Sequence, residues 1–216
     1  MTDFAQRRRM MVDTQVRPSD VTKFPIIEAM LRIPREVFVP SEKAEAAYAG
    51  RNIDLGDNRV VLDPRTFAKM LDALGVDHDD LVLDVGTGYG YSSAVIARIA
   101  QAVVAVEEDE SWASDAEALL SEHADNVIVH RGPIAEGAAE HGPYDAIIVE
   151  GGVEELPDTI GAQVKEGGRI ACLFVEGNLG TVRIGWKNDG HITWRFAFNA
   201  SAPVLPGFET TEEFAL

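Results

Sequence analysis

The chain is poor in the features that mark secreted, membrane-spanning and disulfide-linked proteins. It has one cysteine in 216 residues, so no internal disulfide can form and a reducing cytoplasm is expected. No apolar run approaches the length that crosses a bilayer. The basic N-terminal residues lack the apolar stretch of a secretory signal. We therefore predict a cytoplasmic protein, with Cys172 as a small core residue in the apolar run "RIACLFV".

Basic residues are also scarce. The chain has 19 Lys and Arg against 36 Asp and Glu, a formal net charge of -17, which is repelled by nucleic acid and by anionic membrane surfaces. The triplet Arg7-Arg8-Arg9 is more typical of a solvated helix face than of a nucleic-acid-binding arm. The five histidines show no metal-ligand spacing. We therefore expect no nucleic-acid partner, no membrane partner and no metal.

The pattern of apolar residues changes near residue 62. Before it, helices are predicted over residues 4–17 and 20–33, with Asp20 as an N-cap unless the second helix begins at Pro25. Residues 1–62 are predicted to form an N-terminal helical extension, and residues 63–216 the main domain. In the main domain, helices are predicted over 65–75, 91–100, 111–124 and 156–168, and strands over 81–86, 102–109, 126–132, 144–152, 169–177 and 181–200, the last being two strands.

Strands that alternate with helices predict an α/β fold with a parallel sheet wound on both faces. The chain then ends differently, because Asn188-Asp189-Gly190 predicts a hairpin between two antiparallel strands. Dinucleotide dehydrogenases continue with another parallel unit, whereas class I methyltransferases finish with an antiparallel strand inserted beside the fifth. The predicted fold is therefore Rossmann-like, of the class I S-adenosylmethionine-dependent methyltransferase type, with an N-terminal helical extension.

A glycine-rich loop follows the first strand of the main domain. Gly86-Thr87-Gly88-Tyr89-Gly90 joins "LVLDV" directly to a helix. Glycines allow a tight turn and close approach of a ligand, and a helix start presents free N–H groups. Glu107 lies 21 residues after Gly86, at the end of the next strand, where a carboxylate can accept hydrogen bonds from both ribose hydroxyls. This order predicts a nucleoside cofactor.

S-adenosylmethionine fits these features better than NAD. It has an amino-acid end and no pyrophosphate, so the glycine spacing can be shorter than in dinucleotide-binding loops. Asp84 precedes the loop and could bind the cofactor's ammonium group, or hydrogen-bond the loop backbone instead. The predicted cofactor-binding residues are Asp84, Gly86, Thr87, Gly88, Gly90 and Glu107.

Nearly the whole chain resembles the protein-L-isoaspartate O-methyltransferase family. The most specific segment is "PREVFVP", which general methyltransferases lack. "AYAGRNIDLG", "VLDVGTGYGYSSAVIA", "YDAIIVEGG" and "LPDTIGAQVKEGGRIACLFV" also resemble family segments, and "APVLPGF" resembles a C-terminal element. The resemblance implies methyl transfer from S-adenosylmethionine, with S-adenosylhomocysteine as product, to the carboxylate of isoaspartyl residues in damaged proteins, which permits repair.

The chain departs from the family in the segment before its first core helix. Asn58–Pro64 lies where the family reads Gly-Gln-Thr-Ile-Ser-Gln-Pro. Leu62 thus occupies the place of a serine whose hydroxyl is held to assist at the acceptor, and leucine cannot form that hydrogen bond. No catalytic residue is assigned. The segment is predicted to be a hydrophobic lid over the cofactor, formed by Val60, Val61, Leu62, Asp63 and Pro64.

Two further departures follow the third and fourth strands. Arg131-Gly132-Pro133 has no acid where the family has one that helps to place the adenosine. Glu150 ends the fourth strand, where it would repel a carboxylate acceptor and suit an amine or hydroxyl, unless it points into solvent or pairs with a basic residue. Three functions remain open: an isoaspartyl methyltransferase, a methyltransferase with another, unknown small acceptor, and a cofactor-binding protein without catalysis.

Overall fold

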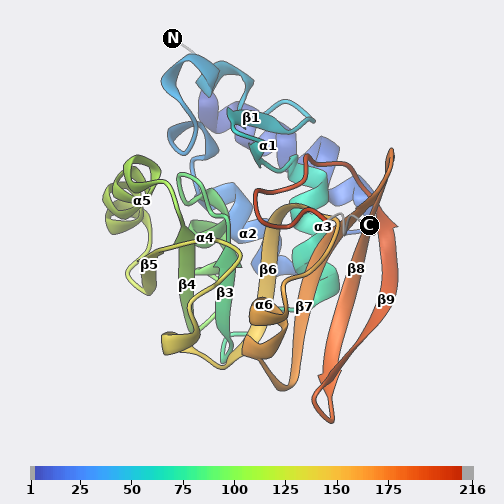
Figure 1. The fold of residues 1–216 in the computed structure, drawn as a ribbon. Coiled ribbons are helices and arrows are strands. Elements are labelled where there is room, and N and C mark those ends of the chain that lie inside the picture. Colours follow the sequence, from blue (N-terminus) through green and yellow to red (C-terminus); the bar gives the residue numbers. More distant parts are fainter. Residues whose placement is uncertain (1–2, 211–216) are drawn as a thin grey trace.

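A seven-stranded sheet runs through the part of the chain that this computed structural model describes, residues 3–210 (Figure 1). The strand order is β5-β4-β3-β6-β7-β8-β9, and the first five of these strands are parallel. The chain passes outward from β3 and then returns to place β6 at its other side, so the order reverses between them. The strands are β3 (Leu81–Val85), β4 (Ala102–Glu107), β5 (Val127–Arg131), β6 (Tyr144–Val153), β7 (Val164–Glu176), β8 (Leu179–Asn188) and β9 (His191–Asn199).

The predicted antiparallel ending is confirmed. β8 pairs antiparallel with β7, and β9 pairs antiparallel with β8 at the edge of the sheet. The turn between them contains Asp189 and Gly190 at φ of 50° and 76°, which an Asp-Gly step accommodates readily. β8 thus lies beside the fifth parallel strand and β9 forms the edge, because a tight turn keeps consecutive strands adjacent.

Helices cover both faces of the sheet. α3 (Pro64–Leu74), α4 (Tyr91–Ile96) and α5 (Glu110–His123) bury Phe67, Val95 and Leu120 in one core cluster, together with Ile148 of β6. α6 (Asp158–Gln163) packs on the opposite face, where Ile160 joins a second cluster with Ile147 and the buried Cys172. No helix in the described residues is long and apolar enough to cross a membrane.

The predicted helix over residues 156–168 is wrong beyond Gln163. β7 begins at Val164. Gly167 and Gly168, the last two residues of the predicted helix, therefore lie within this strand. A Cβ added to Gly168 would lie 2.8 Å from the Lys165 carbonyl oxygen and 3.0 Å from that of Asp145. The glycine therefore permits close backbone packing against β6. α4 is also shorter than predicted and ends at Ile96 rather than residue 100.

The N-terminal extension shares the first core cluster with the main domain. α1 (Phe4–Met11) continues as a π-helical segment (Val12–Val16) and a 3-10 turn (Arg17–Ser19), and α2 spans Phe24–Arg32. Asp20 is not the N-cap of α2, because it has a left-handed φ of 65° and α2 begins four residues later. The helix start near Pro25 is confirmed. The boundary at residue 62 stays a prediction, and residues 211–216 lie outside the described residues. Shorter 3-10 helices span Arg35–Val37, Ser41–Ala46 and Ala139–His141.

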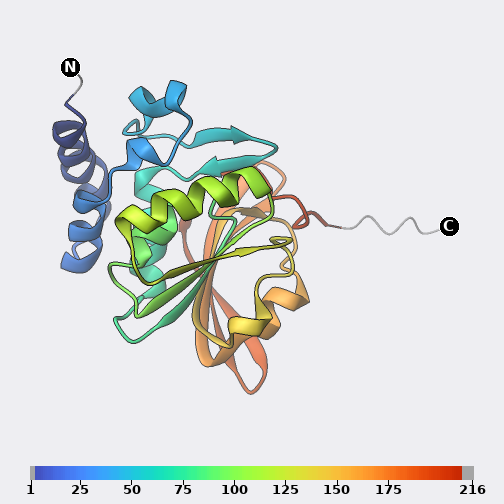
Figure 2. The same cartoon turned by 90° about the vertical axis from the view of Figure 1, so that its left-hand side faces the viewer.

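The segment "DNRVVLDP" forms part of a hairpin rather than a loop. β1 (Ile53–Gly56) pairs antiparallel with β2 (Arg59–Val61), and Asp57 and Asn58 make the turn with φ of 48° and 57°. Two left-handed residues are characteristic of a type I′ hairpin turn. Figure 2 shows this hairpin lying beside α5, on the side of the molecule that carries the N-terminal helices. The described residues place the hairpin in a separate two-stranded sheet, outside the central one.

Asp63 connects this hairpin to α3. Its carboxylate accepts a hydrogen bond from the Thr66 N–H at 3.0 Å, and its own N–H donates to the Asn52 side chain at 2.8 Å. Pro64 follows as the first residue of the helix, and Gly75 ends it in the left-handed conformation. The N-cap therefore determines where the hairpin enters the helix.

We expect Asp63→Ala to lower the free energy of unfolding by about 1 kcal/mol, because the N-cap hydrogen bond is lost. Asp63→Asn should retain most of the stability, since the amide oxygen can accept the same bond. Urea denaturation of the three proteins measures the difference. Equal stability of the Ala and Asn variants would show that the cap does not stabilise α3.

Candidate active site

The glycine loop lies at the carboxyl edge of the sheet, where the strand order reverses between β3 and β6. Ligands of doubly wound folds bind at such a switch point. Gly86, Gly88 and Gly90 all have left-handed φ angles, of 81°, 59° and 92°, so residues with a Cβ would be strained there. The Gly86 and Thr87 N–H groups donate to the Val106 carbonyl of β4 at 3.0 and 3.2 Å. The loop is thereby held against the end of β4.

Asp84 is fully buried at the end of β3 and has one free carboxylate oxygen. Oδ2 accepts hydrogen bonds from the hydroxyls of Ser92 and Ser93 on α4, whereas Oδ1 has no partner among the described residues. Burial raises the pKa of Asp84 to about 6, and the two serine hydroxyls oppose that rise. A buried oxygen without a donor fits the ammonium group expected from the sequence. The side chain does not bind the loop backbone, which was the other interpretation.

Glu107 lies where the sequence predicts it, at the end of β4 beside the loop, and it is already bound. Arg59 of β2 donates to both carboxylate oxygens, from Nη1 at 3.1 Å and from Nη2 at 2.6 Å. The backbone N–H of Gly88 donates at 2.8 Å, and those of Glu108 and Asp109 at 3.0 Å each. Arg59 is 3% exposed and Glu107 is fully buried. Sequence reasoning identified the acid but missed the arginine.

The apolar part of the hairpin is buried as predicted. Val60 and Val61 are almost inaccessible, and Leu62 is 1% exposed. The Leu62 carbonyl accepts a hydrogen bond from Arg35 Nη2 at 2.6 Å. The backbone of Leu62 therefore holds Arg35, whereas its side chain offers no hydroxyl. Whether the hairpin serves as a lid stays a prediction.

Arg35, from the "PREVFVP" motif, lies beneath this segment and is fully buried. Its Nε donates to the Ala47 carbonyl at 2.8 Å, and its guanidinium carbon stands 4.7 Å from the centre of the Tyr91 ring. Nη1 of Arg35 and the hydroxyl of Tyr91 have no hydrogen-bond partner in the described part of the chain. In the sequence, "PREVFVP" indicated the family, but nothing in the spacing of its residues indicated that Arg35 would lie in the site.

Glu150 is 4% exposed, so the interpretation that it points into solvent is wrong. Within residues 3–210 its Oε1 has no partner, and no ion pair joins it to a basic residue. Ile148 of β6 lies beside Asp84 of β3 in the sheet. Glu150 is two residues after Ile148 on the same strand, so its side chain projects from the same face of the sheet as Asp84. Burial raises the pKa of Glu150 well above its ordinary value, the charge of Asp84 adds to this rise, and Arg35 opposes it.

Four buried polar atoms without partners thus meet beside the glycine loop. Arg35 Nη1 and the Tyr91 hydroxyl can donate, Asp84 Oδ1 accepts, and a protonated Glu150 can do either. Native structures rarely leave buried polar atoms unpaired, because each costs free energy unless a ligand or water supplies the bond. This polar cluster, defined by Arg35, Asp84, Tyr91 and Glu150, therefore fits a polar ligand.

The region after β5 differs from the sequence prediction only in detail. Arg131, which begins the segment without an acid, points to Glu117 on α5 and pairs with it at 2.7 Å. The Gly132 N–H donates to the Glu107 carbonyl at 3.1 Å. This segment supplies no carboxylate in place of the family's acid. The groups left to contact an adenine are backbone groups and the half-buried rings of Tyr89 and Trp112, whose centres are 5.7 Å apart.

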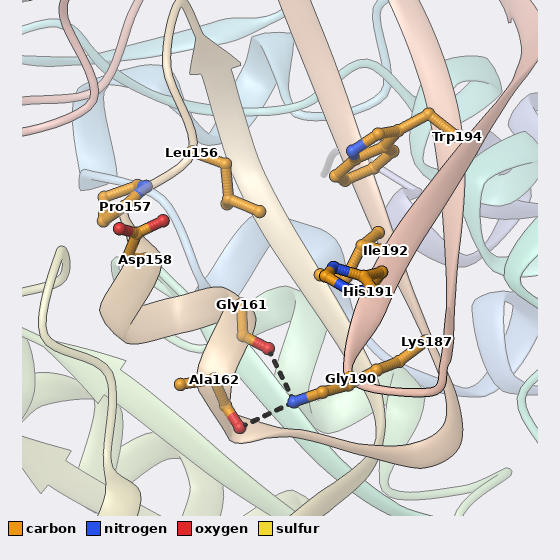
Figure 3. Close-up of a pocket in the computed structure, with 10 residues that line it drawn as sticks. All are labelled: Leu156, Pro157, Asp158, Gly161, Ala162, Lys187, Gly190, His191, Ile192 and Trp194. Atoms are coloured by element: carbon orange, nitrogen blue, oxygen red, sulfur yellow. Dashed lines mark hydrogen bonds between the residues drawn. The ribbon is translucent and has the colours of Figure 1, made fainter.

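A separate cavity of about 430 Å³ lies away from this site, between α6 and the β8–β9 hairpin (Figure 3). Lys187 crosses it to the carbonyl oxygens of Gly161 and Ala162, at 3.2 and 3.0 Å. Trp186, the residue before Lys187, lies opposite Arg169 in the sheet, and Arg169 is near the start of β7. The cavity therefore lies toward the amino edge of the parallel strands. It takes no part in the site at the carboxyl edge.

Comparison with known proteins places the chain among methyltransferases. Residues 6–195 match the family model described as protein-L-isoaspartate(D-aspartate) O-methyltransferase. A protein-L-isoaspartate O-methyltransferase of Syntrophus aciditrophicus is 37% identical over 171 residues, which are 79% of this chain and 78% of the relative. One from Roseiflexus sp. is 31% identical over 214 residues, covering 98% and 97% of the two chains.

Solved structures agree with the fold. A protein-L-isoaspartate O-methyltransferase superposes with a TM-score of 0.80 at 25% identity, over 95% of this chain and 67% of that chain. A putative protein-L-isoaspartate O-methyltransferase from Plasmodium falciparum, in complex with S-adenosyl-L-homocysteine, superposes with a TM-score of 0.78 at 17% identity. The match covers 96% of this chain and 100% of that chain. The predicted class I methyltransferase fold is confirmed.

We expect Glu150→Gln to remove a pH-dependent loss of stability. The raised pKa means that the neutral carboxyl stabilises the fold fully below the ordinary value of 4.5, and that this stability is lost as the pH rises through the folded pKa. As the pH rises above 4.5, the free energy of unfolding of the wild type should therefore fall relative to that of the variant. Urea denaturation at several pH values measures this difference.

The matched control is Glu122→Gln, because Glu122 is exposed on α5. Its pH profile should run parallel to that of the wild type. A Glu150→Gln profile parallel to the wild type would show that Glu150 is not held neutral by burial.

Proposed function

Because the chain belongs to the protein-L-isoaspartate (D-aspartate) O-methyltransferase family, we propose that it methylates the side-chain carboxylate of isoaspartyl residues in damaged proteins. The observation that carries this proposal is the match over nearly the whole chain, including the segment before the glycine loop. The ester formed can collapse to a succinimide, which permits repair. The lone cysteine favours the reducing cytoplasm as the place of this reaction.

The cofactor of the family is S-adenosyl-L-methionine, and the residues of this chain fit most of it. Asp84 Oδ1 is a free buried acceptor for the ammonium group, and the backbone of Gly86–Gly90 allows close approach. Glu107 is the acid for the ribose, although Arg59 holds it in this structure. When bound, the cofactor supplies an electrophilic methyl group, and S-adenosyl-L-homocysteine remains.

The protein contributes chiefly by orienting the two reactants. A carboxylate acceptor is already a nucleophile near neutral pH, so alignment accounts for most of the catalysis and no strong base is needed. Val60 and Leu62 exclude water from one side of the site. Arg35 Nη1 offers a charged donor that suits a carboxylate.

The state of Glu150 decides between two acceptors. Two charged carboxylates about 5 Å apart would repel by roughly 3 kcal/mol at an effective dielectric near 20. Burial favours the neutral form of Glu150, however, and a neutral carboxyl can donate a hydrogen bond to the acceptor. Glu150 would then supply the donor that Leu62 lacks. In the second candidate function, an ionised Glu150 would instead accept a proton from an amine or hydroxyl acceptor.

We expect the protein to transfer label from methyl-labelled S-adenosyl-L-methionine to an isoaspartyl peptide, as a base-labile ester, and not to the matching aspartyl peptide. Glu150→Gln should retain most of this transfer, because an amide still donates a hydrogen bond, whereas Glu150→Leu should lower kcat/KM about tenfold or more. Base-labile counting on the two peptides measures both effects.

Tight cofactor binding without transfer to the isoaspartyl peptide would contradict the proposal. A Leu62→Ser variant that then gained transfer would identify the missing hydroxyl as the cause. If label appeared instead on an amine or hydroxyl acceptor, and Glu150→Gln abolished it, the second candidate function would hold.

A further inference from the structure

The carboxylate of Glu107 has no capacity left for a ribose. A carboxylate offers about four lone-pair positions. Within residues 3–210, five N–H donors already lie at hydrogen-bond distance: two from Arg59 and one each from the backbone of Gly88, Glu108 and Asp109. A ribose diol would add two donors. The three backbone donors belong to the loop and to the start of α5, so Arg59 is the donor that can leave.

We infer that Arg59 occupies the ribose-binding carboxylate of the free protein and must withdraw before the nucleoside end of the cofactor can bind. Arg59 thereby sets the affinity for S-adenosyl-L-methionine. This inference rests on the cofactor assignment in the proposed function, but not on the identity of the methyl acceptor.

The contacts of the β1–β2 hairpin place Arg59 over the nucleoside end of the site. A Cβ added to Gly86 would lie 3.5 Å from Arg59 Nη2, and one added to Gly88 would lie 3.0 Å from Leu55 Cδ1. The guanidinium carbon of Arg59 stands 5.4 Å from the centre of the Trp112 ring. The hairpin thus covers the glycines whose purpose is close approach of a ligand.

Arg59 also has a way to leave. The hairpin belongs to a separate two-stranded sheet, so release of the Arg59 side chain breaks no hydrogen bond of the central sheet. Glu108 Oε1 lies 3.8 Å from Arg59 Nη1 and is partly exposed, with 37% of its side chain accessible. A released guanidinium therefore has a second carboxylate beside it. The buried pair with Glu107 is exchanged for a more exposed pair with Glu108.

The test compares Arg59→Gln with Arg183→Gln, which removes the same charge from a more exposed ion pair, between Arg183 of β8 and Glu176 of β7. Binding of S-adenosyl-L-homocysteine is measured by isothermal titration calorimetry. If the released state is about 1–10% of the free protein, removing Arg59 should tighten binding about 10- to 100-fold, because the apparent dissociation constant scales inversely with the competent fraction. Arg183→Gln should bind like the wild type.

A second measurement separates this role from a structural one. Loss of the buried pair should lower the melting temperature of Arg59→Gln while the affinity rises, whereas a purely structural arginine would lower both. In stopped flow, the tryptophan fluorescence change of the wild type should reach a limiting rate at high ligand concentration, set by the release of Arg59. In Arg59→Gln the rate should keep rising.

Equal or weaker binding by Arg59→Gln than by the wild type would overturn the inference. Equal binding would leave the proposed function standing, because the cofactor would still bind. If none of the three proteins bound S-adenosyl-L-homocysteine, the cofactor assignment would fail as well. A wild type that does not bind, together with an Arg59→Gln variant that does, would support the inference in its strongest form.

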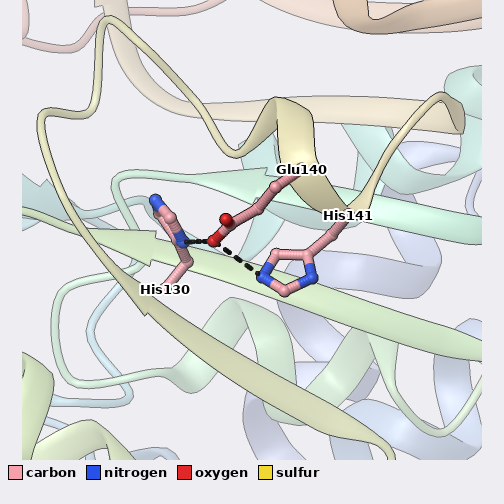
Figure 4. Close-up of side chains that lie close together, drawn as sticks. All are labelled: His130, Glu140 and His141. Atoms are coloured by element: carbon pink, nitrogen blue, oxygen red, sulfur yellow. Dashed lines mark ion pairs between the residues drawn. The ribbon is translucent and has the colours of Figure 1, made fainter.

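A second inference concerns three side chains that the sequence spacing did not bring together. His130 of β5 and Glu140 and His141 of the 3-10 helix Ala139–His141 turn toward one another (Figure 4). Glu140 Oε1 lies 3.4 Å from His130 Nδ1 and 3.4 Å from His141 Nε2. All three ligand atoms lie within 4.8 Å of one another.

The geometry points to a site for a divalent transition metal ion such as Zn²⁺. Ligand atoms about 2.0–2.2 Å from a tetrahedral ion are roughly 3.4 Å apart, which matches both distances to Glu140 Oε1. Two imidazoles and one carboxylate form a common zinc donor set, and the fourth position would take water. The two histidine side chains are partly exposed, at 24% and 33%, and that of Glu140 is exposed, at 68%, so an ion can reach the site from solvent.

This site is tested with Zn²⁺ alone. Protein dialysed against EDTA should bind about one equivalent in calorimetry, and His130→Ala and His141→Ala should each bind at least about tenfold more weakly. His191→Ala, which alters an exposed histidine of the β8–β9 hairpin, should bind like the wild type. Absence of saturable binding, or equal weakening by the His191 variant, would overturn the assignment.

Discussion

The buried pair of Arg59 and Glu107 joins four segments that are distant in the sequence. Glu107 ends β4, and its carboxylate receives N–H groups from the glycine loop, from the start of α5 and from the guanidinium of β2. A charge this deeply buried is tolerated only when charges and hydrogen bonds compensate it. The position of the hairpin over the loop, and of the loop against α5, therefore depends on this one carboxylate.

The two ends of the site differ in how far their polar groups are satisfied. At Glu107 every lone pair has a donor, whereas the polar cluster of Arg35, Asp84, Tyr91 and Glu150 holds four atoms without partners. Under the proposed function, the polar cluster would bind the amino-acid end of the cofactor and the acceptor, while the chain itself holds the nucleoside end. Leu62 links the two ends, because its carbonyl binds Arg35 and it directly follows β2, the strand that carries Arg59.

Local signals predicted the fold well and failed where distant packing decided the structure. Gly75 ended α3, the Asp189-Gly190 step made the final hairpin, and the glycine loop lay between β3 and α4 as expected. The helix over residues 156–168 failed because Gly168 packs against the backbone of β6. Asp20 failed as an N-cap because the preceding 3-10 turn places it in a left-handed conformation. Neither the packing of Gly168 nor the left-handed conformation of Asp20 was indicated by the neighbouring residue types.

The sequence by itself determined the family, the fold class and the place of the acid that follows β4, because these depend on residue types at short, regular spacings. The tertiary structure decided the state of that acid. Arg59 stands 48 residues before Glu107, and only the folding of the hairpin onto the glycine loop brings the two charges together. "DNRVVLDP" predicts an apolar cover, but its arginine acquires a role only through burial, since a guanidinium withdrawn from water must find a carboxylate.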